Sequence, residues 1–164
     1  MTAKQYEKIS APFRTPGRAK ALKTANILIT AIGYAAYPLM LMYLYFMQIQ
    51  TIIPAIAVPA VGFCLLTVIR RKIDRPRPYQ TLDIKPLIRK DKQGKSMPSR
   101  HVFSMTIIAV TGFIISPVLG AFLMVLSFML AAIRVIGGVH YPFDVIVGII
   151  SAIIWGGLWY SILL

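Results

Sequence analysis

Acidic residues are scarce in this chain, with five Asp and Glu against 18 Lys and Arg among 164 residues. Together with only two histidines and one cysteine, they supply no Cys, His and carboxylate set that resembles a metal cage. We therefore expect neither a metal ion nor another cofactor. The lone Cys64 excludes an intramolecular disulfide, and we interpret it as a small packed or lipid-facing residue.

Charge is also scarce and unevenly placed. Charged residues make up 14% of the chain, whereas soluble domains average about a quarter. Six basic residues lie in 1–24, eleven in 70–100, and the last is Arg134. This pattern excludes the soluble nucleic-acid binder that a net charge of +13 would first suggest. It indicates an integral membrane protein.

Three long stretches carry no charge: 24–69, 101–133 and 145–164. A helix needs about 20 apolar residues to cross a bilayer. The first stretch has 46 residues, which suits two crossings with a turn near 48–51, and the last has 20, which suits one. The middle stretch has 33 residues and a plausible break at Pro117. We predict an all-α integral membrane bundle of about five transmembrane helices.

The middle stretch has an alternative interpretation as one long tilted helix. Two spans, at about 98–116 and 118–136, are favoured because they place 70–100 and 134–144 on one membrane face, as the chemistry below requires. By domain, we expect a basic N-terminal interfacial segment, 1–24, and a single membrane-embedded domain, 25–164.

With five spans, all 18 basic residues fall on one membrane face. Cytoplasmic loops are enriched in Lys and Arg, so we expect a multi-pass protein of the cell membrane with this face in the cytoplasm. The alternative is that residues 70–100 are basic for binding and say nothing about orientation. The six basic residues of 1–24 then remain as independent support.

Three polar clusters stand at the ends of expected spans. The first, at residues 70–78, holds Arg70 and Arg77, and its alternating prolines keep it extended. Arginine suits bidentate phosphate recognition, although a basic flank that contacts lipid headgroups is the plainer interpretation. The second cluster, Ser96-Met97-Pro98-Ser99-Arg100-His101, opens the third span. A helix N-terminus can bind phosphate, with His101 beside it, although a lone histidine there is more often interfacial.

The third cluster runs from Arg134 to Asp144, between the last two spans. His140 and Asp144 are four residues apart and share a face if one helix includes both. A carboxylate beside an imidazole fixes its tautomer and raises its basicity; the alternative is a helix-capping Asp with an incidental His. Together the clusters favour metal-free attack of a histidine on phosphorus, with arginines on the charged oxygens and a second histidine protonating the leaving oxygen.

The three clusters resemble the signature of the type 2 phosphatidic acid phosphatase family, the membrane relatives of vanadium haloperoxidases. That signature is Lys-x6-Arg-Pro, Pro-Ser-Gly-His and Ser-Arg-x5-His-x3-Asp. Here the order and spacing are the same over about residues 50–160, and the motifs read Arg70-x6-Arg77-Pro78, Pro98-Ser99-Arg100-His101 and Ile133-Arg134-x5-His140-x3-Asp144.

The resemblance implies roles for the matched residues. His140 is similar to the nucleophile that forms a phosphohistidine, Asp144 to the residue that orients it, and His101 to the general acid. The residues that resemble phosphate ligands are Arg70, Arg77, Ser99 and Arg134.

Three departures from the family pattern stand out. Arg70 replaces Lys and keeps its charge, and Ile133 replaces Ser and removes a hydroxyl. Arg100 replaces Gly, which adds a cation to the substrate phosphate site and suggests contact with a second anionic group.

The function implied is hydrolysis of a lipid phosphate that enters sideways from the surrounding membrane lipids. Candidate substrates are phosphatidylglycerophosphate, phosphatidate, and isoprenyl phosphates or diphosphates; Arg100 and the basic stretch 85–95 favour a doubly anionic headgroup. The main alternative is a non-enzymatic membrane protein whose basic face binds anionic lipid or a partner. A transporter or channel is disfavoured because no charge lies deep in a span.

Overall fold

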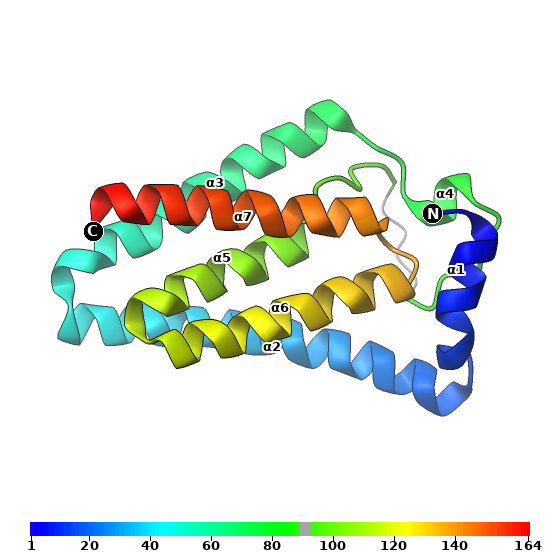
Figure 1. The fold of residues 1–164 in the computed structure, drawn as a ribbon, viewed down its shortest axis with the longest axis horizontal. Helices are drawn as coiled ribbons and strands as arrows, with labels where there is room; N and C mark the ends of the chain where they lie inside the picture. Colours follow the sequence, from blue (N-terminus) through cyan, green and yellow to red (C-terminus); the bar gives the residue numbers. More distant parts are fainter. Residues whose placement is uncertain (89–92) are drawn as a thin grey trace.

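The computed structural model describes residues 1–88 and 93–164, and all regular structure in these residues is helical. Five longer helices lie alongside one another and two shorter ones lie near the end that carries the N-terminus (Figure 1). In chain order the elements are α1 (Ala3–Ser10), η1 (Ala11–Phe13), α2 (Pro16–Met47), η2 (Ile49–Thr51), α3 (Ile52–Ile73), α4 (Pro78–Thr81), α5 (Arg100–Ile115), α6 (Pro117–Ile136) and α7 (Pro142–Leu163).

The predicted membrane bundle of five helices is confirmed. Helices α2, α3, α6 and α7 are long and apolar enough to cross a bilayer. Helix α5 is apolar but has only 16 residues, or about 24 Å at 1.5 Å per residue. It packs against all four of the others, so the shortest of the five long helices is the centre of the bundle.

The middle stretch forms two helices, as predicted, and the break is built from its own residues. Ser116 ends α5 in an extended conformation, and its hydroxyl accepts a hydrogen bond from the backbone N–H of Val118. Pro117 occupies the first position of α6, where its missing N–H leaves no hydrogen bond unmade. The chain therefore reverses at this point, and both ends of the stretch return to the same end of the bundle (Figure 1).

Helix α7 approaches α5 closely along a row of small residues. A β-carbon on Gly148 would lie 3.0 Å from the backbone oxygen of Ser99, and one on Gly156 would lie 2.8 Å from the Ile107 side chain. Ala152, between them, is fully buried. The row brings the first turns of α5 and α7 together.

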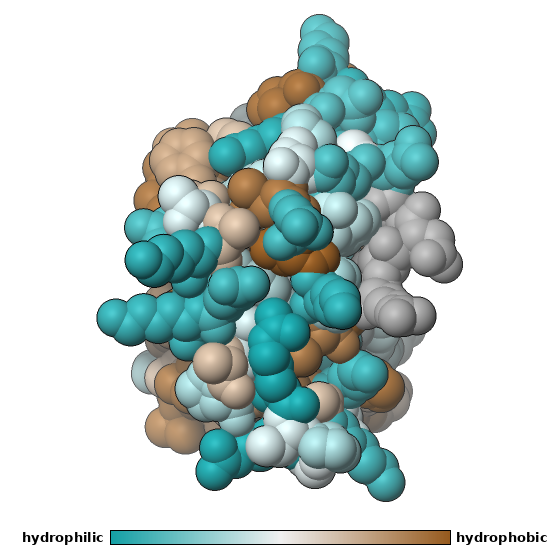
Figure 2. Space-filling view, turned by 90° about the vertical axis from the view of Figure 1, so that its right-hand side faces the viewer, coloured by the Kyte–Doolittle hydropathy of each residue, from teal (hydrophilic) through white to brown (hydrophobic). Residues whose placement is uncertain are grey.

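Helix α1 lies across the end of the bundle (Figure 1). Tyr6 is fully buried, and its hydroxyl accepts from the backbone N–H of Leu87 at 3.3 Å and lies 3.5 Å from the backbone oxygen of Lys85. Helix α2 begins at Pro16, so the expected boundary after residue 24 falls inside a continuous helix, at the point where charged residues end. The end of the molecule that α1 covers is hydrophilic over most of its face, with smaller hydrophobic patches (Figure 2).

Candidate active site

A cavity of about 350 Å³ opens at the hydrophilic end, between the last turns of α3, the segment before α5 and the loop before α7. All three sequence clusters contribute to its wall, and five of the eight predicted site residues line it. The residues that line it are Thr67, Arg70, Arg71, Arg77, Gln93, Gly94, Lys95, Arg100, His101 and His140. The other three predicted residues, Ser99, Arg134 and Asp144, are buried at the same end.

His140 lies two residues before the start of α7, is 2% exposed, and lines the cavity. Its Nδ1 lies 3.6 Å from Oδ2 of Asp144, which is an ion-pair distance and longer than a good hydrogen bond. Asp144 also accepts from the backbone N–H of Tyr141 at 2.9 Å. One carboxylate thus caps α7 and faces Nδ1 of His140, which leaves Nε2 as the nitrogen available for chemistry.

Two further side chains hold Asp144, and both come from other parts of the chain. The Ser96 hydroxyl donates to Oδ2 at 2.5 Å and lies 3.4 Å from Nδ1 of His140. Arg75 donates to Oδ1 at 2.9 Å, and its guanidinium lies 4.5 Å from the centre of the Tyr141 ring. Neither residue is among the predicted site residues, although both lie within the polar clusters of the sequence.

The environment of His140 keeps its imidazole neutral. The pKa of His140 is lowered from 6.5 to about 4, chiefly by burial and also by the positive charges of Arg77 and Arg134. The hydrogen-bonding influence and negative charge of Asp144 raise this pKa and oppose the shift. At neutral pH the ring is therefore unprotonated and has a lone pair on one nitrogen.

Arg70 and Arg77 line the cavity, and their side chains also hold its wall together through hydrogen bonds. The Arg70 guanidinium donates to the backbone oxygens of Lys95 and Pro98. Arg77 donates to the backbone oxygens of Gly94, at 3.1 Å, and Val139, at 3.2 Å. The two arginines therefore tie the segment before α5 to α3 and to the loop that carries His140.

Two predicted phosphate ligands have buried polar atoms with no hydrogen-bond partner among the described residues: the hydroxyl of Ser99, and Nε and Nη1 of Arg134. Arg134 is 1% exposed, and its backbone oxygen accepts from the N–H of His140 at 3.3 Å. Buried donors without partners are costly. An anion bound beside His140 would provide the acceptors that these donors lack.

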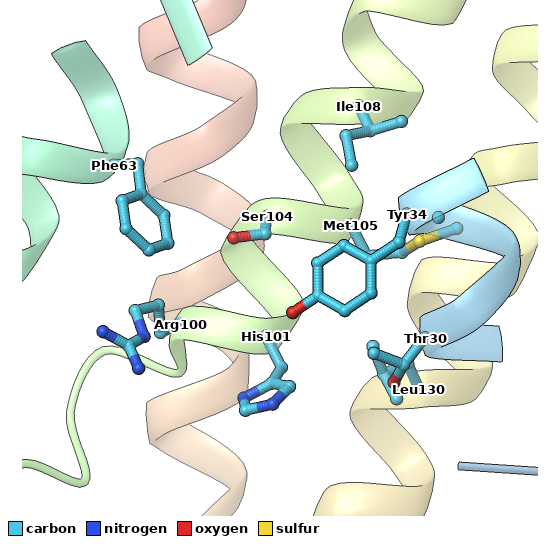
Figure 3. Close-up of a pocket in the computed structure, with 10 residues that line it drawn as sticks. Thr30, Tyr34, Phe63, Arg100, His101, Ser104, Met105, Ile108 and Leu130 are labelled. Carbon is cyan, nitrogen blue, oxygen red and sulfur yellow. The ribbon is translucent and has the colours of Figure 1, made fainter. Parts of the chain in front are cut away.

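The first turn of α5 lies between the cavity and a second, smaller pocket. Arg100 and His101 line both the cavity at the hydrophilic end and a pocket of about 170 Å³ between α2, α3, α5 and α6. In this pocket the Tyr34 ring reaches across from α2 toward the turn of α5 that carries His101 and Ser104 (Figure 3). The Arg100 guanidinium lies 5.4 Å from the centre of the Phe63 ring.

An apolar groove of about 430 Å³ continues from this pocket toward the middle of the bundle. It lies between α2, α3 and α5, and it shares four lining residues with the pocket, namely Tyr34, Phe63, Ser104 and Ile108. The cavity, the pocket and the groove thus follow one another from the hydrophilic end into the apolar bundle.

In the part of the chain that the structure describes, no group of three or more His, Cys, Asp or Glu could hold a metal ion. Of the basic stretch 85–95, residues 89–92 lie outside the described residues.

Comparison with known proteins identifies the family. The model of the PAP2 superfamily matches residues 51–164, so the chain belongs to the PAP2 superfamily. Among solved structures, LpxE of Aquifex aeolicus is similar, with a TM-score of 0.75, 24% identity, and coverage of 98% of this chain and 94% of that one. A transmembrane PAP2-type phosphatidylglycerolphosphate phosphatase from Bacillus subtilis also has a TM-score of 0.75, with 19% identity and coverage of 97% and 84%. Comparison with curated protein sequences gives no significant match.

Proposed function

We propose that this protein is a membrane lipid phosphate phosphatase that works through a phosphohistidine on His140. One observation carries the proposal: a buried, neutral histidine backed by Asp144 opens onto a cavity lined by arginines and a second histidine. Membership of the PAP2 superfamily supports it, and so does the similarity in fold to a structure named as a transmembrane PAP2-type phosphatidylglycerolphosphate phosphatase.

In the first step, Nε2 of His140 attacks the phosphorus of a lipid phosphate. The bond between phosphorus and the lipid oxygen breaks, and His101 gives a proton to that oxygen. Arg70, Arg77 and Arg134, with the Ser99 hydroxyl, hold the phosphoryl oxygens, and Arg134 and Ser99 thereby gain their missing partners.

In the second step, water attacks the phosphorus of phosphohistidine. His101, now without its proton, takes one from the water, and the P–N bond breaks to release phosphate and neutral His140. Asp144 keeps the proton of His140 on Nδ1 throughout, so that Nε2 is free to form and to break the bond to phosphorus.

The apolar groove between α2, α3 and α5 suits the hydrocarbon tail of such a substrate. A tail in the groove and a headgroup in the cavity need no transfer of the lipid into water. This arrangement explains why the reaction is carried out within a membrane bundle.

Purified protein is expected to release phosphate from at least one member of a panel of phosphatidate, phosphatidylglycerophosphate, and isoprenyl phosphate and diphosphate. Activity should persist in EDTA, because histidines and arginines carry the proposed steps. Vanadate should inhibit, since it takes the five-coordinate geometry of phosphorus in the attack. A strict requirement for Mg²⁺ would refute the histidine mechanism.

We further propose that the N-terminus and the cavity face the cytoplasm in the cell membrane. In a Cys64→Ser background, Lys4→Cys and Lys85→Cys should resist an impermeant thiol reagent in intact cells and react after the membrane is opened. Gln50→Cys is the matched control, because it is exposed at the opposite end of the bundle and should react in intact cells. Labelling of Lys4→Cys but not Gln50→Cys in intact cells would reverse the orientation.

A further inference from the structure

The order of the three connected spaces limits where each part of a substrate can lie. The cavity at His140 takes the reacting phosphate, and the apolar groove takes the tail. Between them stands the first turn of α5, where Arg100 and His101 line both the cavity and the adjoining pocket. The part of the lipid that links the terminal phosphate to the tail must therefore pass Arg100.

Arg100 is placed to contact that linking part. It is half-buried, and its guanidinium lies against the Phe63 ring, 5.4 Å from the centre of the ring, at the edge of the pocket. Stacking on an aromatic ring fixes the direction of an arginine and leaves its edge free to donate hydrogen bonds. This residue is a second cationic site, separate from the buried Arg134 that lies beside His140.

The described residues that form the walls around Arg100 carry positive charge and no negative charge. Arg71 and Lys95 line the same cavity and are exposed, and among the residues that the structure describes no carboxylate lines either the cavity or the pocket. Asp144, which faces His140, is engaged by Arg75 and Ser96. A neutral linking part would leave these cations without a partner, whereas an anionic one would neutralise them.

On the basis of the proposed function, we infer that the substrate carries a second phosphate between its terminal phosphate and its tail, and that Arg100 binds this second phosphate. Two kinds of lipid have this chemistry: a lipid diphosphate and a diacylglycerol linked by a phosphodiester to glycerol phosphate. The bond that breaks is still the one between the terminal phosphorus and its bridging oxygen. The product keeps the second phosphate, and the proton from His101 goes to the oxygen that leaves.

The test compares, for each variant, the kcat/KM on different lipid substrates. Purified wild type, Arg100→Gly and Lys72→Gln are assayed for kcat/KM on an isoprenyl diphosphate, on phosphatidylglycerophosphate and on phosphatidate, which has no second phosphate. A charge-assisted contact to phosphate predicts that Arg100→Gly loses about 10- to 100-fold more kcat/KM on the substrate with the second phosphate than on phosphatidate. Lys72, which is exposed at the end of α3 and lines neither space, controls for the loss of one charge, and its variant should keep the wild-type ratio.

The outcomes separate this inference from the proposed function. A selective loss on isoprenyl diphosphate alone identifies a lipid diphosphate as the source of the second phosphate, and a selective loss on phosphatidylglycerophosphate alone identifies the phosphodiester. An equal loss on all three lipids would overturn the inference and leave the phosphatase assignment intact, because Arg100 would then act on the reacting phosphate. Wild type that releases phosphate from none of the lipids would overturn both.

Discussion

Replacement of His140 by alanine is expected to leave no detectable phosphate release and no phosphoenzyme. The imidazole is the proposed nucleophile, and the described residues that line the cavity include one other imidazole, that of His101. No side chain can take over a lost nucleophile unless it can reach the phosphorus from the same side. The loss should therefore exceed the effect of any other single replacement in the site.

His101→Ala is the informative comparison for His140→Ala. A positioned general acid is worth about 10² to 10⁴ in rate, so this variant should be slow rather than dead. On an aryl phosphate, whose leaving group needs no proton, it should still form phosphoenzyme. The measurement is trapping of an acid-labile, base-stable phosphoenzyme from radiolabelled substrate, together with steady-state phosphate release.

Three results would contradict these roles. Label that survives His140→Ala, or that maps to His101, would reassign the nucleophile. Anionic-lipid binding that the double variant of His101 and His140 keeps in full, together with no phosphate release from the wild type, would favour the alternative of a membrane protein that binds anionic lipid without catalysis. Because His140 is buried, the thermal unfolding of each variant in detergent shows whether a loss of activity is a loss of folding.

The bundle was predictable because its determinants are local in the sequence. Uncharged stretches of 46, 33 and 20 residues set the number of crossings through the thickness of a bilayer. Pro117 set the break in the middle stretch, and the observed helices α5 and α6 end within two residues of the predicted spans. The position of α5 at the centre of the bundle was not predictable. In a membrane protein the sequence of an apolar helix is similarly hydrophobic whether the helix faces lipid or other helices.

The candidate site was predictable as three motifs but not as a network. Spacing alone pairs His140 with Asp144, whereas Arg75 and Ser96 lie 69 and 48 residues away from that carboxylate in sequence. Arg70 carries the charge that its motif suggests, yet its guanidinium donates to backbone oxygens of the segment before α5. Contacts of this kind depend on how the loops fold against one another, so the periodicity of the sequence does not predict them.

Asp144→Asn is expected to lower the rate of phosphoenzyme formation by about 10²- to 10⁴-fold, between the effects at His140 and the wild type. The carboxylate is the group that raises the pKa of His140 against the effect of burial, so its removal makes the imidazole still less basic and a weaker nucleophile. A neutral amide oxygen at the position of Oδ2 also accepts the Nδ1 proton more weakly than a carboxylate does, so it holds the tautomer of the ring less firmly.

The same replacement should cost little stability. The asparagine carbonyl can still accept from Ser96 and from the backbone N–H of Tyr141, which keeps the cap of α7. Arg75 loses its ion pair, but its side chain is 34% exposed and can be hydrated, so about 1 kcal/mol or less is at stake. Activity and folding should therefore separate in this variant.

Rapid-quench trapping of the phosphoenzyme measures the rate in question, and Asp83→Asn is the matched control. Asp83 is an exposed carboxylate on the segment that follows α4, at the same end of the bundle, so its loss changes the charge without touching His140. Arg75→Gln keeps the carboxylate and removes only its cation, and the proposed role of Asp144 predicts a smaller loss for this variant than for Asp144→Asn. If Asp144→Asn forms phosphoenzyme as fast as the wild type, the carboxylate only caps α7, and His140 needs no orienting partner.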